Sequence, residues 1–343
     1  MALGKTTVVR HAAFEKYWFQ LKVEWLAMPE IRETHVVWLE KDSFRVAIPR
    51  PAAAHVWTEY NHTPPETLLQ RIGPASILIV NKCRIGPAEL DACPHLEMIA
   101  IAATGTDNVD LNACEARGIT VKNVVNYGAH AVAEHVMASL LTLTRHTREW
   151  SKLAHDGTWS ESRFFCLHTH AMRSLSSQTL GILGSGAIGQ QLALFAQAFG
   201  MSVIRLERQG AKQIRPGYVP FEQGLKTVDA LSLHCPLNPE TRGLINRKTL
   251  ALMKPDAIVL NTARGGLVVF EDLLEALETG RLGGAAIDVL DVEPPPKNHL
   301  MVRASHPRLL LTPHVAWATV EAQTTLAGRV KQNIDAFLSA RPK

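Results

Sequence analysis

The sequence has no long uninterrupted apolar run, no paired cysteine motif and no strong excess of charge of one sign. A membrane-spanning helix needs about 18 consecutive apolar residues, and a secretory signal needs an apolar segment near the N-terminus, so we expect neither a membrane partner nor export. The 36 Lys+Arg and 32 Asp+Glu leave a net charge of only +4, which is too small to predict nucleic-acid binding. These absences predict a cytoplasmic protein that acts on a small molecule.

Cysteine is also scarce. The five cysteines are odd in number and include no C-x-x-C pair, which argues against a disulfide framework and a zinc knuckle. Cys166, His168 and His170 have a C-x-H-x-H spacing, but no fourth ligand is evident. We therefore expect no metal.

Strand and helix patterns divide the chain into two sets. With 343 residues and about 150 residues per domain, two domains are expected. In the larger set, short uncharged runs alternate with helical patterns, which predicts a parallel, doubly wound α/β sheet. Its strand candidates are residues 180–183, 203–206, 231–233, 258–260, 285–289 and 309–311. A smaller, less regular α/β set has strand candidates at 36–39, 77–80, 98–102 and 120–124.

Helical patterns connect the two sets. A helix over 132–143 leads from the smaller set into the larger one, and a helix over 320–338 is placed to return, which would make the smaller domain discontinuous. The boundaries that we expect are an extension at 1–34, a substrate domain at 35–130 and 318–343, and a cofactor domain at 131–317. Aromatic residues at helical spacing in the extension predict a helix packed on the body or on a neighbouring subunit, with a poorly ordered segment as the alternative.

A glycine-rich motif follows the first strand of the larger set. It comprises Gly184, Ser185, Gly186, Ala187, Ile188 and Gly189, which form G-x-G-x-x-G between a strand and a helix. In this context the first glycine permits a tight turn, the second lets the backbone approach a pyrophosphate, and the third lets helix and strand pack closely. The motif predicts dinucleotide binding, with an ordinary glycine-rich turn as the alternative.

An acidic residue supports the dinucleotide prediction. Glu207 lies 18 positions after Gly189, at the end of the next strand. It would accept hydrogen bonds from the adenosine ribose hydroxyls and repel a 2′-phosphate, which favours NAD. The neighbouring Arg208 would pair with such a phosphate, so NADP stays possible. A solvated strand end is the alternative for both residues.

Several further motifs occur in one order along the chain. They are residues 103–110 (ATGTDNVD), 234–237 (HCPL), 261–266 (NTARGG), Asp288-Val289 with Glu293-Pro294, and Thr312-Pro313-His314. On these residues the chain resembles the D-isomer-specific 2-hydroxyacid dehydrogenases over about residues 35 to 343. The H-V-A-W run at 314–317 is most similar to the glycerate dehydrogenase or hydroxypyruvate reductase branch. The resemblance implies a Rossmann-type cofactor domain, a smaller flavodoxin-like substrate domain with a cleft between them, and a homodimer.

The resemblance implies that Arg264, Glu293 and His314 are the catalytic residues. Reducing a 2-oxo acid requires a hydride at the carbonyl carbon and a proton at the oxygen. Imidazole titrates near neutral pH, and a neighbouring carboxylate favours its charged form. The guanidinium fork holds the substrate carboxylate and polarises the carbonyl, while backbone N–H groups around Thr104 and Gly105 bind the other carboxylate oxygen.

The resemblance also implies cofactor contacts from residues that follow other strands. These are His234, Cys235, Pro236, Ala263 and Asp288. For Asp288 the implied partner is the nicotinamide carboxamide, and capping of a turn is the competing role. Trp317 either walls the substrate pocket or packs in the core.

The resulting functional prediction is NAD(P)H-dependent reduction of a small 2-oxo acid, such as hydroxypyruvate or glyoxylate, and the reverse oxidation of the D-2-hydroxy acid. Formate-dehydrogenase-like hydride transfer is disfavoured, because relatives of that kind carry glutamine where Glu293 stands. The other alternative is a C-terminal binding protein corepressor, in which the same fold is an NAD-gated interaction scaffold. Turnover of 2-oxo acids distinguishes these alternatives.

Overall fold

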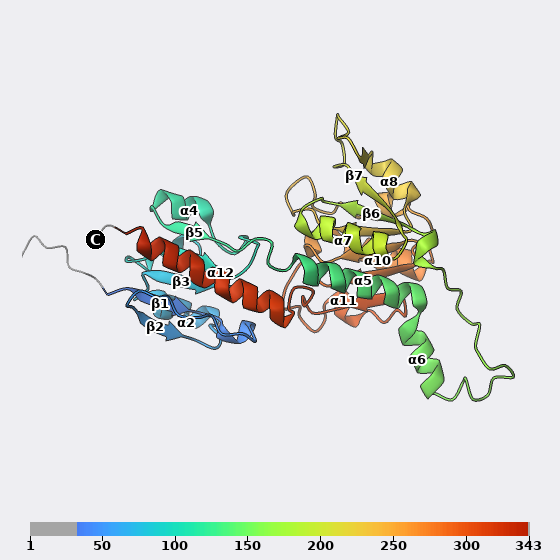
Figure 1. The fold of residues 1–343 in the computed structure, drawn as a ribbon, viewed down its shortest axis with the longest axis horizontal. Helices are drawn as coiled ribbons and strands as arrows, with labels where there is room; N and C mark the ends of the chain where they lie inside the picture. The colour runs from blue at the N-terminus through green and yellow to red at the C-terminus, as the bar shows by residue number, and fades with distance from the viewer. Residues whose placement is uncertain (1–32, 342–343) are drawn as a thin grey trace, which may run out of the picture.

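The computed structural model describes residues 33–341, which form two lobes, each built on a parallel sheet (Figure 1). The helix predicted in the N-terminal extension lies outside the described residues. In the part of the chain that the structure describes, no helix has the length and apolar character that a membrane span requires.

The first lobe contains a five-stranded sheet in the order β2-β1-β3-β4-β5. This is the strand order of flavodoxin-like folds. Four of the strands match the predictions, whereas the edge strand β2, which is only partly buried, was missed. The strands are β1 (His35–Trp38), β2 (Val56–Glu59), β3 (Ile77–Val80), β4 (Met98–Ile101) and β5 (Thr120–Lys122), with helices η1 (Lys41–Ser43), α2 (Pro65–Ile72), α3 (Pro87–Asp91) and α4 (Leu111–Ala116).

The second lobe contains a seven-stranded sheet in the order β12-β11-β10-β9-β6-β7-β8. The order reverses beside β6, as in doubly wound dinucleotide-binding folds. All six predicted strands are present, and the two-residue strand β8 was missed. The strands are β6 (Thr179–Leu183), β7 (Ser202–Leu206), β8 (Tyr218–Val219), β9 (Ala230–Leu233), β10 (Ile258–Asn261), β11 (Gly284–Ile287) and β12 (Leu309–Leu311).

Helices cover both faces of this second sheet, which confirms the α/β fold class. They are α5 (Ala129–Arg145), α7 (Ala187–Ala198), α8 (Phe221–Thr227), α9 (Arg247–Leu250), α10 (Phe270–Glu278) and α11 (Leu300–Arg303), with the short helices η2 (Leu175–Ser177) and η3 (Gly265–Leu267). Apolar side chains from α5 and α7 share one core cluster with the sheet, and those from α8 and α10 share another on the opposite face.

The C-terminal helix α12 (Val320–Ser339) lies along the first lobe, although it follows the second lobe in the chain (Figure 1). Its buried Leu326, Val330 and Ile334 pack in one cluster with Trp38 and Met98 of the first sheet. Thr319 caps its N-terminus by accepting a hydrogen bond from the N–H of Ala322 at 3.2 Å. The chain therefore crosses between the lobes twice, once before α5 and once before α12.

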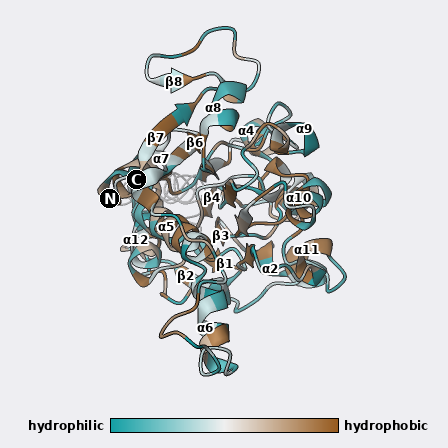
Figure 2. Cartoon of the chain, turned by 90° about the vertical axis from the view of Figure 1, so that its right-hand side faces the viewer, coloured by the Kyte–Doolittle hydropathy of each residue, from teal (hydrophilic) through white to brown (hydrophobic). Residues whose placement is uncertain are grey.

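Two segments project from the second lobe. The helix α6 (Thr147–His155) with the loop after it and the loop that ends in β8 extend in opposite directions (Figure 2). The loop after α6 carries Phe164 and Phe165, which are 73% and 91% exposed. Such exposure of large apolar side chains on one projection is typical of a contact surface.

Candidate active site

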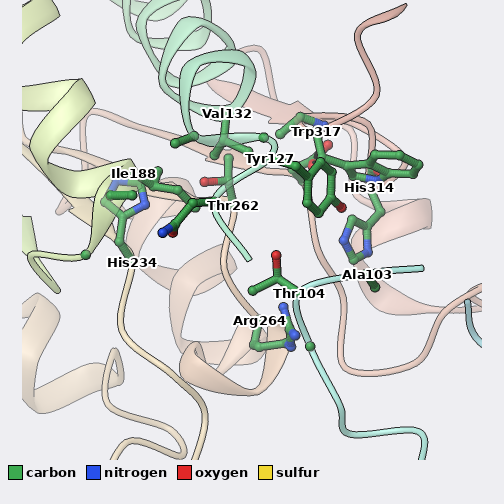
Figure 3. A pocket seen from close by; sticks show the side chains of 18 of the residues that line it. Ala103, Thr104, Tyr127, Val132, Ile188, His234, Thr262, Arg264, His314 and Trp317 are labelled. Carbon is green, nitrogen blue, oxygen red and sulfur yellow. Dashed lines mark hydrogen bonds between the residues drawn. The ribbon is translucent and has the colours of Figure 1, made fainter. Parts of the chain in front are cut away.

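One cleft lies between the lobes, at the carboxyl ends of strands from both sheets. Figure 3 shows side chains that line it. Ligands of open α/β sheets bind at these strand ends. The cleft has a volume of about 280 Å³. From the first lobe it is lined by residues 81–82 and 103–105, and from the second by residues 186–189, His234, Thr262, Arg264, Asp288 and His314, with 126–129, Val132, Ala316 and Trp317 between them.

The glycine motif forms the turn between β6 and α7. Gly184 has φ +101°, and a Cβ there would lie 2.5 Å from the carbonyl carbon of His234. A Cβ on Gly189 would lie 2.3 Å from the carbonyl oxygen of Gly184. Gly186, at the N-cap of α7, faces open space, so its backbone remains accessible at the positive end of the helix. Gly184 and Gly189 are therefore required because a side chain would clash, and Gly186 leaves its backbone open to a ligand.

The surroundings of this turn fit a bound dinucleotide. The hydroxyl oxygens of Ser185 and Thr262 are buried without a hydrogen-bond partner among the described residues. Buried hydroxyls left unpaired are costly, so such atoms point to a polar ligand. Together with the open backbone at Gly186 they match the phosphate and sugar groups of a nicotinamide dinucleotide.

Glu207 lies at the end of β7 with only 1% of its side chain exposed. The guanidinium of Arg215 donates to both carboxylate oxygens, at 2.6 and 2.8 Å, and the backbone N–H of Arg208 donates at 2.9 Å. The Arg215 hydrogen bonds, followed by that of Arg208, lower the pKa of Glu207 to about 2. The Arg208 side chain is 86% exposed. Arg215, which was not predicted, therefore holds the carboxylate that the sequence assigned to the ribose.

Of the cofactor-contact residues expected after β9 and β10, only His234 lines the cleft. Its Nε2 lies 2.8 Å from the hydroxyl of Ser232. Burial lowers the pKa of His234 to about 4, so its ring is neutral at pH 7. Burial likewise raises the pKa of the Cys235 thiol to about 11. Cys235, Pro236 and Ala263 do not line the cleft, although Ala263 supports the β10 turn through an N–H bond to Asn261.

His314 and Glu293 form a close pair, with 2.6 Å between Nδ1 and Oε2. Their side chains are 26% and 32% exposed, and the N–H of Leu290 fixes the other Glu293 oxygen at 2.8 Å. Burial raises the pKa of Glu293, but the hydrogen bond and charge of His314 outweigh it, so the pKa is lowered overall. The pairing leaves Nε2 of His314 without a hydrogen-bond partner among the described residues.

Asp288 is the residue that shapes the His314 turn. Its carboxylate accepts hydrogen bonds from the N–H groups of Val315 and Ala316, at 3.0 and 2.9 Å, and from the hydroxyl of Thr312 at 2.5 Å. Its backbone oxygen accepts from the N–H of His314 at 2.8 Å. The geometry favours the turn-capping alternative for this side chain, although Asp288 also lines the cleft.

Arg264 reaches across the cleft to the first lobe. Its Nε and Nη2 lie 3.1 and 3.0 Å from Oδ2 of Asp107. Gly105 permits this approach, because a Cβ there would lie 2.1 Å from Nη2. The Thr104 hydroxyl turns away and donates to the carbonyl of Val124. The 104–105 loop and the Arg264 fork therefore lie close together at the cleft, and Asp107 occupies the fork where a substrate carboxylate is expected.

Trp317 belongs both to the cleft wall and to the core. Its Nε1 donates to the carbonyl of His314 at 3.0 Å, and its ring meets the edges of Phe44 and Tyr127. Tyr127 also lines the cleft beside His314 (Figure 3). The sequence reasoning missed Tyr127, Asp107, Arg215 and Lys82. Lys82 had a usable signal, because only Asn81 separates it from the end of the apolar strand β3.

The residues of the C-x-H-x-H spacing are only partly brought together in the structure. Among residues 33–341, no group of three or more His, Cys, Asp or Glu is placed to hold a metal ion. Cys166 Sγ lies 3.2 Å from His168 Nε2, but His170 instead stacks on His146. All three residues of the C-x-H-x-H spacing lie in the loop after α6.

Comparisons with known proteins establish the family. Residues 137–316 match the family of the D-isomer specific 2-hydroxyacid dehydrogenase NAD binding domain. A 2-hydroxyacid dehydrogenase of Haemophilus influenzae is 42% identical over 85% of this chain and 94% of its own length. A glycerate dehydrogenase of Methylorubrum extorquens is 38% identical over 90% and 97%. The chain belongs to the D-isomer specific 2-hydroxyacid dehydrogenase family.

The fold comparison agrees with this assignment. The crystal structure of the TT0316 protein from Thermus thermophilus superposes with a TM-score of 0.77 and 34% sequence identity, covering 90% of this chain and 98% of that one. The predicted family and the predicted two-lobed α/β fold are therefore confirmed.

Proposed function

We propose that this chain reduces a small 2-oxo acid, such as hydroxypyruvate, with a nicotinamide dinucleotide and also catalyses the reverse reaction. The observation that carries the proposal is the convergence of Arg264, the His314–Glu293 pair and the glycine turn on one cleft. Bound NADH supplies the hydride for the carbonyl carbon. The glycerate dehydrogenase name of the Methylorubrum extorquens relative supports hydroxypyruvate as the substrate.

The protein side chains then perform binding and proton transfer. Arg264 leaves Asp107 and binds the substrate carboxylate, with the N–H groups at Thr104 and Gly105 on its other oxygen. His314 donates a proton from Nε2 to the carbonyl oxygen, while Glu293 holds Nδ1 and stabilises the charged ring. Asp288 acts as a positioning residue, since it fixes the backbone on both sides of His314.

We propose NADH as the preferred cofactor. The charged Glu207 at the end of β7 would repel a 2′-phosphate and accept the ribose hydroxyls. The Arg215 fork, however, offsets part of this negative charge, and Arg208 is exposed beside it. These two arginines support a graded preference, in which NADPH is used less efficiently than NADH.

We further propose a homodimer in the cytoplasm, with a substrate domain at 35–130 and 318–343 and a cofactor domain at 131–317. The projecting loop after α6 supports the dimer, because its exposed Phe164 and Phe165 need a partner surface. Sedimentation of wild type and of a Phe164→Ser, Phe165→Ser double variant tests this assembly. A wild-type monomer would contradict it.

The test of the proposed activity is a panel of 2-oxo acids with NADH and NADPH, followed by absorbance. We expect turnover of hydroxypyruvate with NADH, and loss of that turnover in Arg264→Ala. Absence of turnover with every acid, despite tight NADH binding, would instead support the NAD-gated scaffold that the resemblance leaves as the alternative.

A further inference from the structure

Lys82 is a charged residue that lines the cleft and has no part in the proposed proton transfer or carboxylate binding. It follows strand β3, whose last residue Val80 pairs with Ile101 of β4. Lys82 therefore lies beside the 103–105 loop that approaches Arg264, and both segments line the cleft.

A buried carboxylate holds the backbone of this turn. Glu40, which is 9% exposed, accepts hydrogen bonds from the N–H groups of Asn81, Lys82 and Cys83 at 2.8, 2.9 and 3.0 Å. Three such bonds fix the main chain while leaving the lysine side chain free to reach a ligand. The hydrogen bonds to Glu40 therefore hold the backbone of Lys82 at the cleft.

The ammonium group has no direct partner. Arg264 pairs with Asp107 and His314 pairs with Glu293, whereas Lys82 makes no side-chain hydrogen bond or ion pair within residues 33–341. Lys82 is solvent-exposed by surface area, and desolvation by the protein atoms packed around it, followed by the charge of Arg264, lowers its pKa. Water solvates this exposed ammonium, and because no protein group occupies it, it is available to a ligand oxygen that enters the cleft and replaces that water.

The surrounding charges select the kind of acceptor. The carboxylates of Glu293, Glu40 and Asp107 all act on Lys82 and oppose the lowering of its pKa. A second carboxylate on the substrate would be repelled by these three groups, whereas a neutral hydroxyl would not. We propose that Lys82 binds the C3 hydroxyl of a 3-hydroxy-2-oxo acid, an inference that rests on the proposed function. This contact would select such an acid over acids without the hydroxyl.

Three substrates isolate the proposed contact, because hydroxypyruvate carries the C3 hydroxyl, pyruvate carries a methyl group and glyoxylate has no C3. For Lys82→Met we expect kcat/KM with NADH to fall about 10- to 100-fold on hydroxypyruvate, the range for a hydrogen bond to a charged group. The values for pyruvate and glyoxylate are expected to stay within about threefold. Lys82→Arg, which keeps a charged donor, should recover part of the preference.

Lys122→Met is the matched control, because Lys122 is exposed on β5 of the same sheet and does not line the cleft. Thermal unfolding and fluorescence titration with NADH check that Lys82→Met folds and binds cofactor normally. An equal loss on all three acids, or an unchanged hydroxypyruvate-to-pyruvate ratio in an active enzyme, would overturn the inference alone. Absence of activity on every acid in the wild type would overturn the proposed function and the inference together.

Discussion

Replacing Glu293 by Gln tests the proton-transfer pair most directly. Reduction needs the imidazolium form of His314, whereas oxidation of the hydroxy acid needs neutral imidazole. The pKa of Glu293 is lowered, so this group is a carboxylate throughout the neutral range and attracts the imidazolium charge. The glutamine amide retains a hydrogen-bond acceptor but loses that attraction.

The size of the effect follows from the geometry of the pair. A hydrogen bond to a charged group contributes about 1.5–3 kcal/mol. The two side chains are 26% and 32% exposed, so solvent screening places this pair at the lower end of that range. At about 1.4 kcal/mol per pH unit, the alkaline limb of reduction should move down by about one pH unit. Oxidation should become active at correspondingly lower pH.

The assay is kcat/KM against pH in both directions, for wild type, Glu293→Gln and the control Glu321→Gln on the exposed surface of α12. In His314→Ala both directions should slow by about 10²- to 10⁴-fold, since proton transfer is lost. An alkaline limb that stays in place in Glu293→Gln, with chemistry shown to limit the rate, would refute the role of Glu293 as the partner of His314.

Three further predictions concern the cofactor turn and the substrate clamp. Glu207→Ala removes the carboxylate but keeps Arg215 and Arg208, so kcat/KM with NADPH relative to NADH should rise about tenfold or more; an unchanged ratio would contradict the proposed discrimination. Arg264→Lys keeps the charge but loses the fork, so kcat/KM on hydroxypyruvate should fall about 10²-fold, and near-wild-type kinetics would argue against the clamp. Gly189→Ala places a Cβ against the carbonyl oxygen of Gly184, so it should cost about 1–3 kcal/mol of stability and weaken NADH binding, as measured by calorimetry and fluorescence titration.

Some of the fold could be predicted because its signals are local. Buried parallel strands are short apolar runs, and the glycine turn requires particular residues at fixed spacing. Ten of the twelve strands in the described residues were therefore located from sequence. The edge strands β2 and β8 were missed, because a half-buried edge lacks the continuous apolar run of a central strand.

The site depended on side-chain contacts that strand and motif patterns do not specify. The sequence alone determined which residue types follow each strand, since that order is local information. Only the tertiary structure brought Asp107 to Arg264 across the cleft, placed Arg215 on Glu207 and used the Asp288 carboxylate to cap the His314 turn. The Asp107–Arg264 pairing depends on lobe packing, because no spacing in the sequence encodes the distance between two side chains from different sheets. The other two pairings depend on how loops fold at the strand ends of one sheet.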